Sequence, residues 1–347
     1  MAQDGIRFTR FYSIGPVCAP TRASALTGRH YMRFGMMDVN VGRIPKQEIS
    51  IARLCKEKGY ATGHFGKWHL GTLSKTESPR HKDPEKDFAP PWERDYDDAL
   101  ATEISVPTWD PAGGKYPKHD SPYWHNGKKV TENLAGDDSR VIMDRALPFI
   151  QKAVAAGKPF MTTIWFHAPH SPVVAGPKYL KMYESYKEGE QHYYGCITAM
   201  DEQIGRLRKE LKKLGVDNNT AIWFCSDNGP EGGGKPKKKY DAYNGAFYGN
   251  AGEFSGRKRS LYNGGVCVPA LMVWPNKVKA AQVIDTPCST LDYLPTVVDK
   301  IAGTYPDKRP LDGESLLPLI EGQEFKRKKF IPFASKIKGV QAALIRG

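Results

Sequence analysis

The chain has 347 residues, of which 40% are hydrophobic, so it can form an ample core in one large α/β domain or two smaller ones. Its formal net charge of +13 favours polyanionic partners such as sulfated glycans or nucleic acids. No apolar stretch is long enough to span a membrane, and the six cysteines show neither CxxC nor zinc-type spacing, so we expect neither a membrane segment nor a zinc site.

The first predicted element that carries chemistry is a helix that begins near Cys18. Pro20 suits the first turn of a helix, and Gly28 suits the residue that ends it. Cys18 would then lie at the positive end of the helix, which favours anions, and Arg22 lies about one turn further on, where it can hold one. A single cysteine before a helix is often an ordinary buried residue, so this segment alone leaves both interpretations open.

Strands and helices alternate along the rest of the chain. The hydrophobic patterns predict helices over residues 50–58, 138–156, 197–214 and 291–301. They predict strands over residues 60–65, 160–166, 221–225 and 271–274. Residues 72–136 are rich in Pro, Lys, Asp and Gly and are expected to form long loops. The alternation predicts an α/β fold with a mostly parallel central sheet and helices on both faces, a three-layer sandwich.

Reactive side chains follow three of these predicted strands. Ligands of such sheets bind beyond the carboxyl ends of the strands, so we expect the groups at these ends to form one site. These residues are Lys67 and His69 after the first strand, His167 and His170 after the second, and Asp227 and Asn228 after the third.

Two segments resemble signatures of the type I, formylglycine-dependent sulfatases of the alkaline phosphatase superfamily. Residues 18–29 read Cys-Ala-Pro-Thr-Arg-Ala-Ser-Ala-Leu-Thr-Gly-Arg, which is similar to the family pattern Cys-x-Pro-Ser/Thr-Arg-x-x-x-Leu-Thr-Gly. Residues 59–71 contain Gly-Tyr-Ala-Thr followed by Gly-Lys-Trp-His, which is similar to the second signature. Both signatures in this order are improbable by chance, so the chain is identified as a member of this family.

The resemblance implies an arylsulfatase-like sulfuric ester hydrolase that acts on an aryl or carbohydrate sulfate ester. Cys18 would be converted by a formylglycine-generating enzyme to an aldehyde, whose hydrate attacks sulfur. Arg22 would stabilise the oxyanion of the hydrate. Lys67 would draw charge from the sulfate oxygens, together with Lys258, which lies in the family-like stretch Gly-Arg-Lys.

The remaining site residues are also assigned by the resemblance. His170, in Ala-Pro-His-Ser-Pro, would protonate the leaving alcohol, and His69 would help to expel sulfate. His167 is expected to support the site. Asp227 and Asn228 would bind a calcium ion, the implied cofactor, through their oxygen atoms. The sequence departs from the family where Asn263 and Cys267 stand in place of Glu and Arg, which removes both charges of a usual pair.

The match extends over nearly the whole chain, but two family features are not found. The family begins with a strand ending in an Asp-Asp pair that binds calcium, and it ends in a smaller C-terminal subdomain. We therefore expect residues 1–347 to form a sulfatase catalytic domain that lacks this first strand and the C-terminal subdomain, and to bind calcium more weakly than a full-length relative. Residues 1–6 do not resemble a signal peptide. Because such sulfatases are often exported, a periplasmic or secreted location stays open.

Two alternatives remain from the sequence. One is a phosphoesterase or phosphonate monoester hydrolase on the same fold. The other is an inactive fragment with an incomplete metal site that only binds sulfated polysaccharide through its basic surface. Two basic runs lie at residues 235–239 and 326–329. Neither run has the aromatic residues or the fold signature of a nucleic-acid module, so we expect no nucleic-acid partner.

Mass spectrometry of the peptide that contains Cys18 tests the family interpretation. In protein purified from a host with the converting enzyme, we expect an aldehyde in place of the thiol. The reason is chemical, because a sulfated thiol would have no second hydroxyl group with which to eject sulfate. An intact thiol from such a host would count against an enzymatic role.

Overall fold

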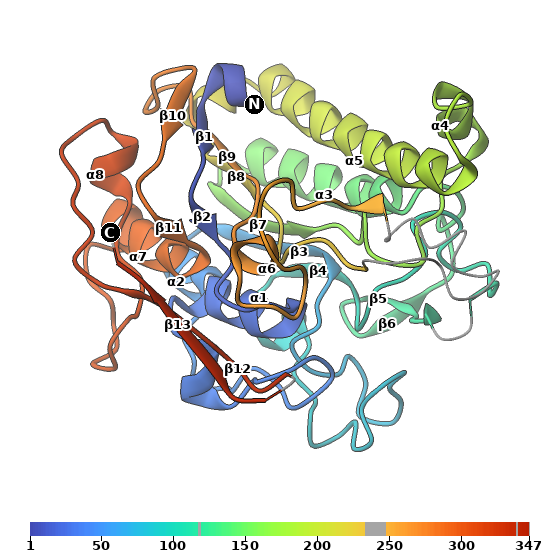
Figure 1. The fold of residues 1–347 in the computed structure, drawn as a ribbon, viewed down its shortest axis with the longest axis horizontal. Coiled ribbons are helices and arrows are strands. Elements are labelled where there is room, and N and C mark those ends of the chain that lie inside the picture. Colours follow the sequence, from blue (N-terminus) through green and yellow to red (C-terminus); the bar gives the residue numbers. More distant parts are fainter. Residues whose placement is uncertain (117–118, 233–247, 338, 347) are drawn as a thin grey trace. The chain divides into compact units, whose positions relative to one another are not determined.

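The computed structural model describes residues 1–116, 119–232, 248–337 and 339–346. The chain divides into two compact units, each described by itself below (Figure 1). The first unit consists of Met1–Lys58, Leu211–Pro230 and Ala251–Gly347, and the second of Gly59–Glu210 and Glu231–Asn250. The basic run at residues 235–239 lies outside the described residues.

The second unit contains a five-stranded sheet in the order β6-β5-β4-β3-β7. Strand β3 is parallel to both of its neighbours, β4 and β7, whereas β5 and β6 pair antiparallel. The strands are β3 (Ala61–Lys67), β4 (Asp98–Thr102), β5 (Tyr123–His125), β6 (Lys128–Val130) and β7 (Phe160–Trp165). The helices are η3 (Pro91–Glu93), α3 (Asp138–Ala155), α4 (Pro177–Met182) and α5 (Glu188–Lys213), the last of which continues into the first unit.

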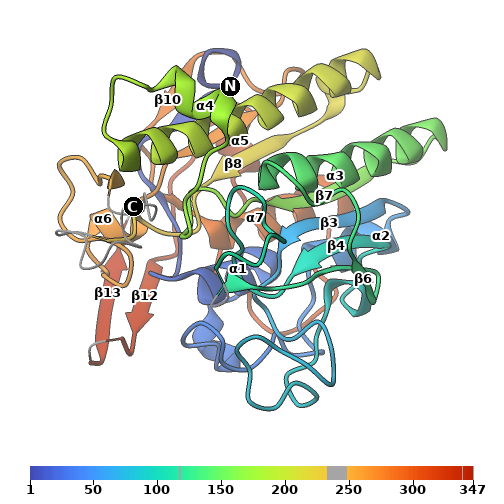
Figure 2. The ribbon, with the colours of Figure 1, turned by 90° about the vertical axis from the view of Figure 1, so that its right-hand side faces the viewer.

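Helix α3 packs against β3, β4 and β7, as Figure 2 shows. Its first turn is capped by Asp137, whose side chain accepts a hydrogen bond from the Arg140 N–H. Two glycines of β3 make the close packing possible, since a Cβ atom on Gly63 would lie 2.9 Å from the Phe149 ring. A Cβ atom on Gly66 would lie 2.1 Å from the carbonyl oxygen of Trp165 in β7. These close contacts hold β3 tightly between its two parallel neighbours, β4 and β7.

The first unit is built on a four-stranded sheet in the order β10-β1-β9-β8. Strand β1 is parallel to β10 and antiparallel to β9, and β8 is antiparallel to β9. The strands of this sheet are β1 (Ile6–Phe8), β8 (Ile222–Cys225), β9 (Ala270–Val273) and β10 (Gln282–Ile284). Strands β2 (Phe11–Tyr12) and β11 (Cys288–Ser289) form a separate parallel pair, and β12 (Ile331–Ser335) and β13 (Gln341–Ile345) form an antiparallel pair.

Short helices complete the first unit. Ile6, Phe8 and Phe11 form a buried core with residues of β9, and the Phe8 ring stacks on Trp223 with 6.0 Å between the ring centres. The α-helices are α1 (Cys18–Thr27), α2 (Ile51–Glu57), α6 (Asn263–Val266), α7 (Tyr293–Val297) and α8 (Leu317–Ile320). Single turns are η1 (Ala2–Asp4), η2 (Tyr31–Phe34), η5 (Asp217–Asn219), η8 (Thr290–Asp292) and the π-type η9 (Val298–Ala302). Among the described helices, none combines the length and apolarity that crossing a membrane requires.

The mixed α/β fold is confirmed, but a mostly parallel sheet is not. Each strand predicted from an apolar run is present, yet β8 and β9 are antiparallel neighbours. Parallel neighbours need a crossover, usually a helix, and in the described part of the segment between β8 and β9 the longest helix is the four-residue α6. The helix expected over 291–301 is divided among η8, α7 and η9.

Replacing Gly66 with Ala should destabilise the protein far more than replacing Gly59 with Ala. Both glycines have a positive φ angle, +111° and +83°, so both variants carry backbone strain of about 1–2 kcal/mol. Only at Gly66 does the added methyl group also meet a backbone atom, because nothing lies within 4 Å at Gly59. We expect Gly66→Ala to lower the free energy of unfolding by at least about 4 kcal/mol in urea titrations. Equal losses for the two variants would contradict the close packing of β3 on β7.

Candidate active site

Helix α1 begins at Cys18 and ends at Thr27, as the sequence predicts. All ten of its residues are buried. Gly28 follows with a φ angle of 62°, and its N–H donates a hydrogen bond to the Ser24 carbonyl at 2.9 Å. The first-turn Pro and the C-terminal Gly therefore fix both ends of the helix.

Four of the predicted site residues meet at the start of α1 in the first unit. The thiol of Cys18 donates to Oδ1 of Asn228 at 3.5 Å. The Arg22 guanidinium donates two hydrogen bonds, at 3.0 and 2.7 Å, to Oδ2 of Asp227. The Arg22 side chain is 8% exposed and that of Asp227 27%, so this ion pair is partly shielded from water. The turn after β8 thus pairs with both reactive positions of α1.

Lys258 is tied to the same place through its backbone. Its backbone N–H donates to the Pro230 carbonyl at 3.1 Å. The backbone N–H of the next residue, Arg259, donates to the Pro16 carbonyl at 2.9 Å. Pro230 follows the Asp227 turn, and Pro16 precedes α1. The segment carrying Lys258 is therefore bound to both of the segments that hold the other four residues.

Glycines bring the turn after β8 and the segment that follows Lys258 into direct backbone contact. The Gly229 N–H donates to the Gly265 carbonyl at 2.8 Å. A Cβ atom on Gly229 would lie 1.9 Å from the Gly264 carbonyl oxygen, and one on Gly265 would lie 2.1 Å from the Ser260 carbonyl oxygen. No larger residue fits at these positions without displacing backbone, which explains the Gly-Gly pair in this stretch of the sequence.

Lys67 and His69 lie together in the second unit at the carboxyl end of β3. Both are nearly buried, with 2% and 8% exposure. The backbone N–H of the intervening residue, Trp68, donates to the Thr102 carbonyl at 2.9 Å. The backbone N–H of His69 donates to the Glu103 carbonyl at 3.1 Å. His69 has a φ angle of 62°, a left-handed conformation that is uncommon for residues other than glycine and clusters at functional sites.

His170 lies in the loop that follows β7 in the same unit. Its N–H donates to the His167 carbonyl at 2.7 Å, and its Nδ1 lies 2.6 Å from the Ser171 carbonyl oxygen. A carbonyl can only accept, so Nδ1 carries a proton and donates it to the Ser171 carbonyl. Sequence reasoning missed His119, whose ring centre lies 6.4 Å from that of His170.

The turn at Asp227 and Asn228 supplies oxygen atoms of the kind that calcium prefers. Calcium takes six to eight such ligands, and these two side chains offer few of them. Oδ2 of Asp227 is engaged by Arg22. Within the part of the chain that the structure describes, no group of three or more His, Cys, Asp or Glu residues is arranged to hold a metal ion. The residues present therefore match calcium in chemistry and do not complete its coordination shell.

Comparison with known proteins identifies the family. The family model described as Sulfatase matches residues 1–303. The chain belongs to the sulfatase family. N-acetylgalactosamine-6-sulfatase of Canis lupus familiaris is 30% identical over 341 residues, which cover 93% of this chain and 60% of that protein. Arylsulfatase G of Mus musculus is 28% identical and is covered to 63%, so this sulfatase chain spans a little under two thirds of the length of these relatives.

Solved structures agree with the family. The structure of Ps i-CgsB in complex with k-i-k-neocarrahexaose has a TM-score of 0.82 and 27% identity, and the match covers 99% of this chain and 75% of that chain. A phosphonate monoester hydrolase of Agrobacterium radiobacter has a TM-score of 0.60 at 19% identity and covers 96% of this chain and 74% of its own, which shows a shared fold only. The fold of this chain is thus shared with a protein that is named as a phosphonate monoester hydrolase.

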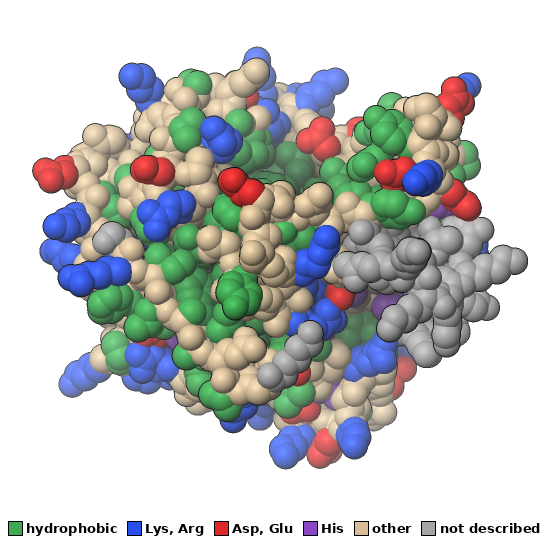
Figure 3. All heavy atoms as spheres, viewed as in Figure 1, with side chains coloured by type: hydrophobic (Ala, Val, Ile, Leu, Met, Phe, Trp, Pro, Cys, Tyr) green, Lys and Arg blue, Asp and Glu red, His purple; other side chains and the backbone are tan. Residues whose placement is uncertain are grey.

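Two of the four cationic side chains in the basic run at residues 326–329 are engaged within the protein. Arg327 is buried and forms two hydrogen bonds, at 3.0 and 2.7 Å, with the buried carboxylate of Asp292. The Lys329 ammonium donates to the carbonyls of Leu311 and Gly313 at 2.9 and 3.0 Å. Figure 3 shows Lys and Arg side chains at many separate places on the visible face, with Asp and Glu between them.

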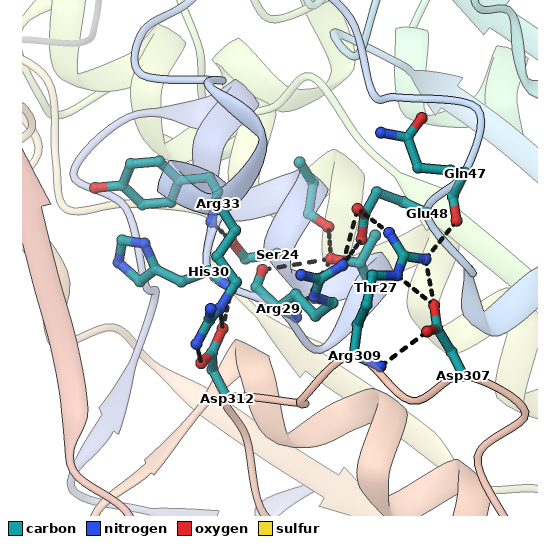
Figure 4. A network of polar contacts seen from close by, with 12 residues as sticks. Ser24, Thr27, Arg29, His30, Arg33, Gln47, Glu48, Asp307, Arg309 and Asp312 are labelled. Atoms are coloured by element: carbon teal, nitrogen blue, oxygen red, sulfur yellow. Dashed lines mark hydrogen bonds and ion pairs between the residues drawn. The ribbon is translucent and has the colours of Figure 1, made fainter.

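A network of charged residues at the other end of α1 was not predicted from the sequence (Figure 4). Nη1 of Arg29 donates to both carboxylate oxygens of Glu48 at 2.9 Å, and Arg309 donates to Oε1 of Glu48 at 2.8 Å. The backbone N–H of His30 and the Arg33 guanidinium bind Asp312. Burial lowers the pKa of His30 to about 4, so this imidazole is neutral beside two cationic residues near pH 7.

Replacing Glu48 with Gln should be strongly destabilising in this sulfatase. The Glu48 and Arg29 side chains are 3% and 8% exposed, so the variant leaves a buried guanidinium without its counter-charge. We expect a loss of about 3–5 kcal/mol in the free energy of unfolding.

The matched control is Glu57→Gln. Glu57 pairs with Arg53 on the surface of α2, where the side chains are 50% and 44% exposed, and it should change stability by less than about 1 kcal/mol. Chemical denaturation of both variants provides the comparison. A Glu48 variant as stable as the Glu57 control would show that the network does not hold the end of α1.

Proposed function

We propose that the protein hydrolyses sulfate esters of carbohydrates, with Cys18 converted to formylglycine as the nucleophile. The observation that carries this proposal is the pairing of Cys18 and Arg22, one helical turn apart in α1, with Asn228 and Asp227. The names of similar proteins support a carbohydrate substrate, since they include N-acetylgalactosamine-6-sulfatase and a structure solved with a carrageenan-type hexaose.

The environment of residue 18 suits a negatively charged substrate. Residue 18 lies at the N-terminus of a buried helix, where unpaired N–H groups and the helix dipole favour an anion. The Arg22 guanidinium lies one turn on, and its hydrogen bonds to Asp227 fix its orientation. When present, formylglycine supplies a hydrated aldehyde whose oxygen can attack sulfur. Arg22 would hold negative charge that develops at this position.

The residues of the second unit would handle the sulfate group and the protons. Lys67 would contribute a positive charge from a nearly buried position, and Lys258 of the first unit would contribute another. His170 would protonate the leaving alcohol through Nε2, because its Nδ1 is occupied by the Ser171 carbonyl. His69 would assist the release of sulfate.

Calcium remains the proposed cofactor, with Asp227 and Asn228 as its ligands from this chain. Their side-chain oxygens are of the hard type that calcium binds. A formylglycine-generating enzyme is the proposed modifying partner, because the segment around Cys18 has the form of the family signature.

Sulfate release from defined substrates tests the function. Protein carrying formylglycine should release sulfate from N-acetylgalactosamine 6-sulfate or carrageenan oligosaccharides, as measured by ion chromatography. Cys18→Ala should abolish turnover, and His170→Asn should lower kcat roughly 10²–10⁴-fold through loss of the proton donor.

The control variant is His125→Gln, which should retain full activity because His125 pairs with Asp98 at a place where both side chains are partly exposed. Faster turnover of an aryl phosphate or phosphonate ester would instead favour a phosphoesterase. Tight binding of the sulfated glycan with no sulfate release, despite complete conversion of Cys18, would favour a non-catalytic binder.

A further inference from the structure

The second unit contains four buried polar residues, linked by hydrogen bonds, that the proposed mechanism does not use. They come from four segments: Thr102 at the end of β4, Tyr123 in β5, Asp138 at the start of α3 and His167 after β7. None is more than 2% exposed. Nε2 of His167 lies 2.7 Å from the Thr102 hydroxyl, and Nδ1 lies 2.7 Å from Oδ2 of Asp138. The Tyr123 hydroxyl donates to the other oxygen of Asp138.

The hydrogen atoms in this hydrogen-bonded set can be assigned from the partners of each residue. The Thr102 hydroxyl donates its only hydrogen to the Ile104 carbonyl at 2.8 Å, so it accepts from Nε2–H of His167. Burial, followed by the Asp138 charge, raises the pKa of Tyr123 well above its usual value, so the phenol keeps its proton and donates it. One proton then remains between Nδ1 of His167 and Asp138, as in an imidazolium–carboxylate pair.

This arrangement differs from a hydroxyl–imidazole–carboxylate catalytic triad. In a triad the hydroxyl donates to the imidazole and faces the substrate. Here the hydroxyl of Thr102 accepts from His167, and it is fully buried. These four residues therefore offer no free nucleophile, and they act by holding neighbouring segments in place.

Asp138 holds both ends of the loop that carries His170. At one end, its carboxylate binds the His167 ring, and the His167 carbonyl accepts the N–H of His170 at 2.7 Å. At the other end, the Asp138 N–H donates to the Thr108 carbonyl at 3.1 Å. Thr108 in turn donates its N–H to the Pro172 carbonyl at 3.1 Å, and its hydroxyl accepts from the Val174 N–H at 2.7 Å.

We propose that Asp138 is a positioning residue for His170, acting through the hydrogen bond between its carboxylate and Nδ1–H of His167 and through Thr108. The proposal rests on the proposed role of His170 in sulfate ester hydrolysis. A displacement of about 1 Å in a catalytic group can lower a rate roughly 10²-fold, so a loop held at both ends matters for turnover.

Two substitutions separate the hydrogen bonds of Asp138 from its shared proton. In Asp138→Asn, the amide oxygen can accept from Tyr123 and the amide nitrogen can donate to Nδ1 of His167. The hydrogen bonds are then kept, and His167 becomes neutral. In Asp138→Ala, both side-chain bonds are lost while the backbone bond to Thr108 remains. Asp144→Ala, on the same helix, removes ion pairs with Arg140 and Arg206 and serves as the destabilisation control.

The first experiment does not depend on activity. In nitrogen-15 NMR of the histidine rings, wild-type His167 should carry protons on both ring nitrogens, and the Asn variant on one. The backbone N–H of His170 should exchange with solvent at least about tenfold faster in Asp138→Ala, and at the wild-type rate in Asp138→Asn and Asp144→Ala. A singly protonated His167 in the wild type, or unchanged exchange in Asp138→Ala, would overturn the proposal.

The second experiment tests whether the effect passes through His170. In formylglycine-containing protein, Asp138→Ala should lower kcat roughly 10–10²-fold with little change in KM, and Asp138→Asn should stay within a few-fold of wild type. In a His170→Asn background, Asp138→Ala should have no further effect on kcat. Additive losses, or an Asn variant as impaired as the Ala variant, would contradict positioning through hydrogen bonds. If the wild-type protein released no sulfate, the proposed function would fail, and the NMR results would still decide the role of Asp138.

Discussion

The ion pair between Arg22 and Asp227 is the interaction on which the candidate site of the first unit depends. These residues are 205 positions apart in the sequence, and their two short hydrogen bonds join the N-terminal half of α1 to the turn after β8. The adjacent contact between Cys18 and Asn228 fits this pairing, because Asn228 follows Asp227 in the sequence and Cys18 lies one helical turn before Arg22. Without it, the reactive position would lie beside an uncompensated guanidinium in a largely buried environment.

The C-terminal end of α1 is held by a second group of ion-paired residues. A helix with all ten residues buried cannot rely on water for the polar groups at its ends. The Gly28 carbonyl accepts from the Asp312 N–H at 2.9 Å, and Glu48 lies between two guanidinium groups just beyond it. Figure 4 shows these groups directed toward one another. Helix α1 is therefore fixed in position at both termini by charge.

Local signals in the sequence predicted local features well. Pro20 and Gly28 correctly placed the two ends of α1, because these residues restrict the backbone of their own positions. The apolar runs correctly placed β3, β7, β8 and β9. The antiparallel pairing of β8 with β9 was missed, because strand direction is set by partners elsewhere in the chain. The Glu48 network was missed for the same reason, since Arg309 lies 261 positions away from Glu48.

The contact of Gly229 with Gly264 and Gly265 limits which residues the two loops can accept. These loops are held in register by backbone atoms, with a carbonyl oxygen 1.9 Å from where a side chain on Gly229 would begin. Any substitution at Gly229 would therefore have to displace backbone. The residues on either side of the Gly-Gly pair, Asn263 and Cys267, carry no opposite charges, so the register of this loop comes from the absence of side chains at its glycines and not from an ion pair between its flanks.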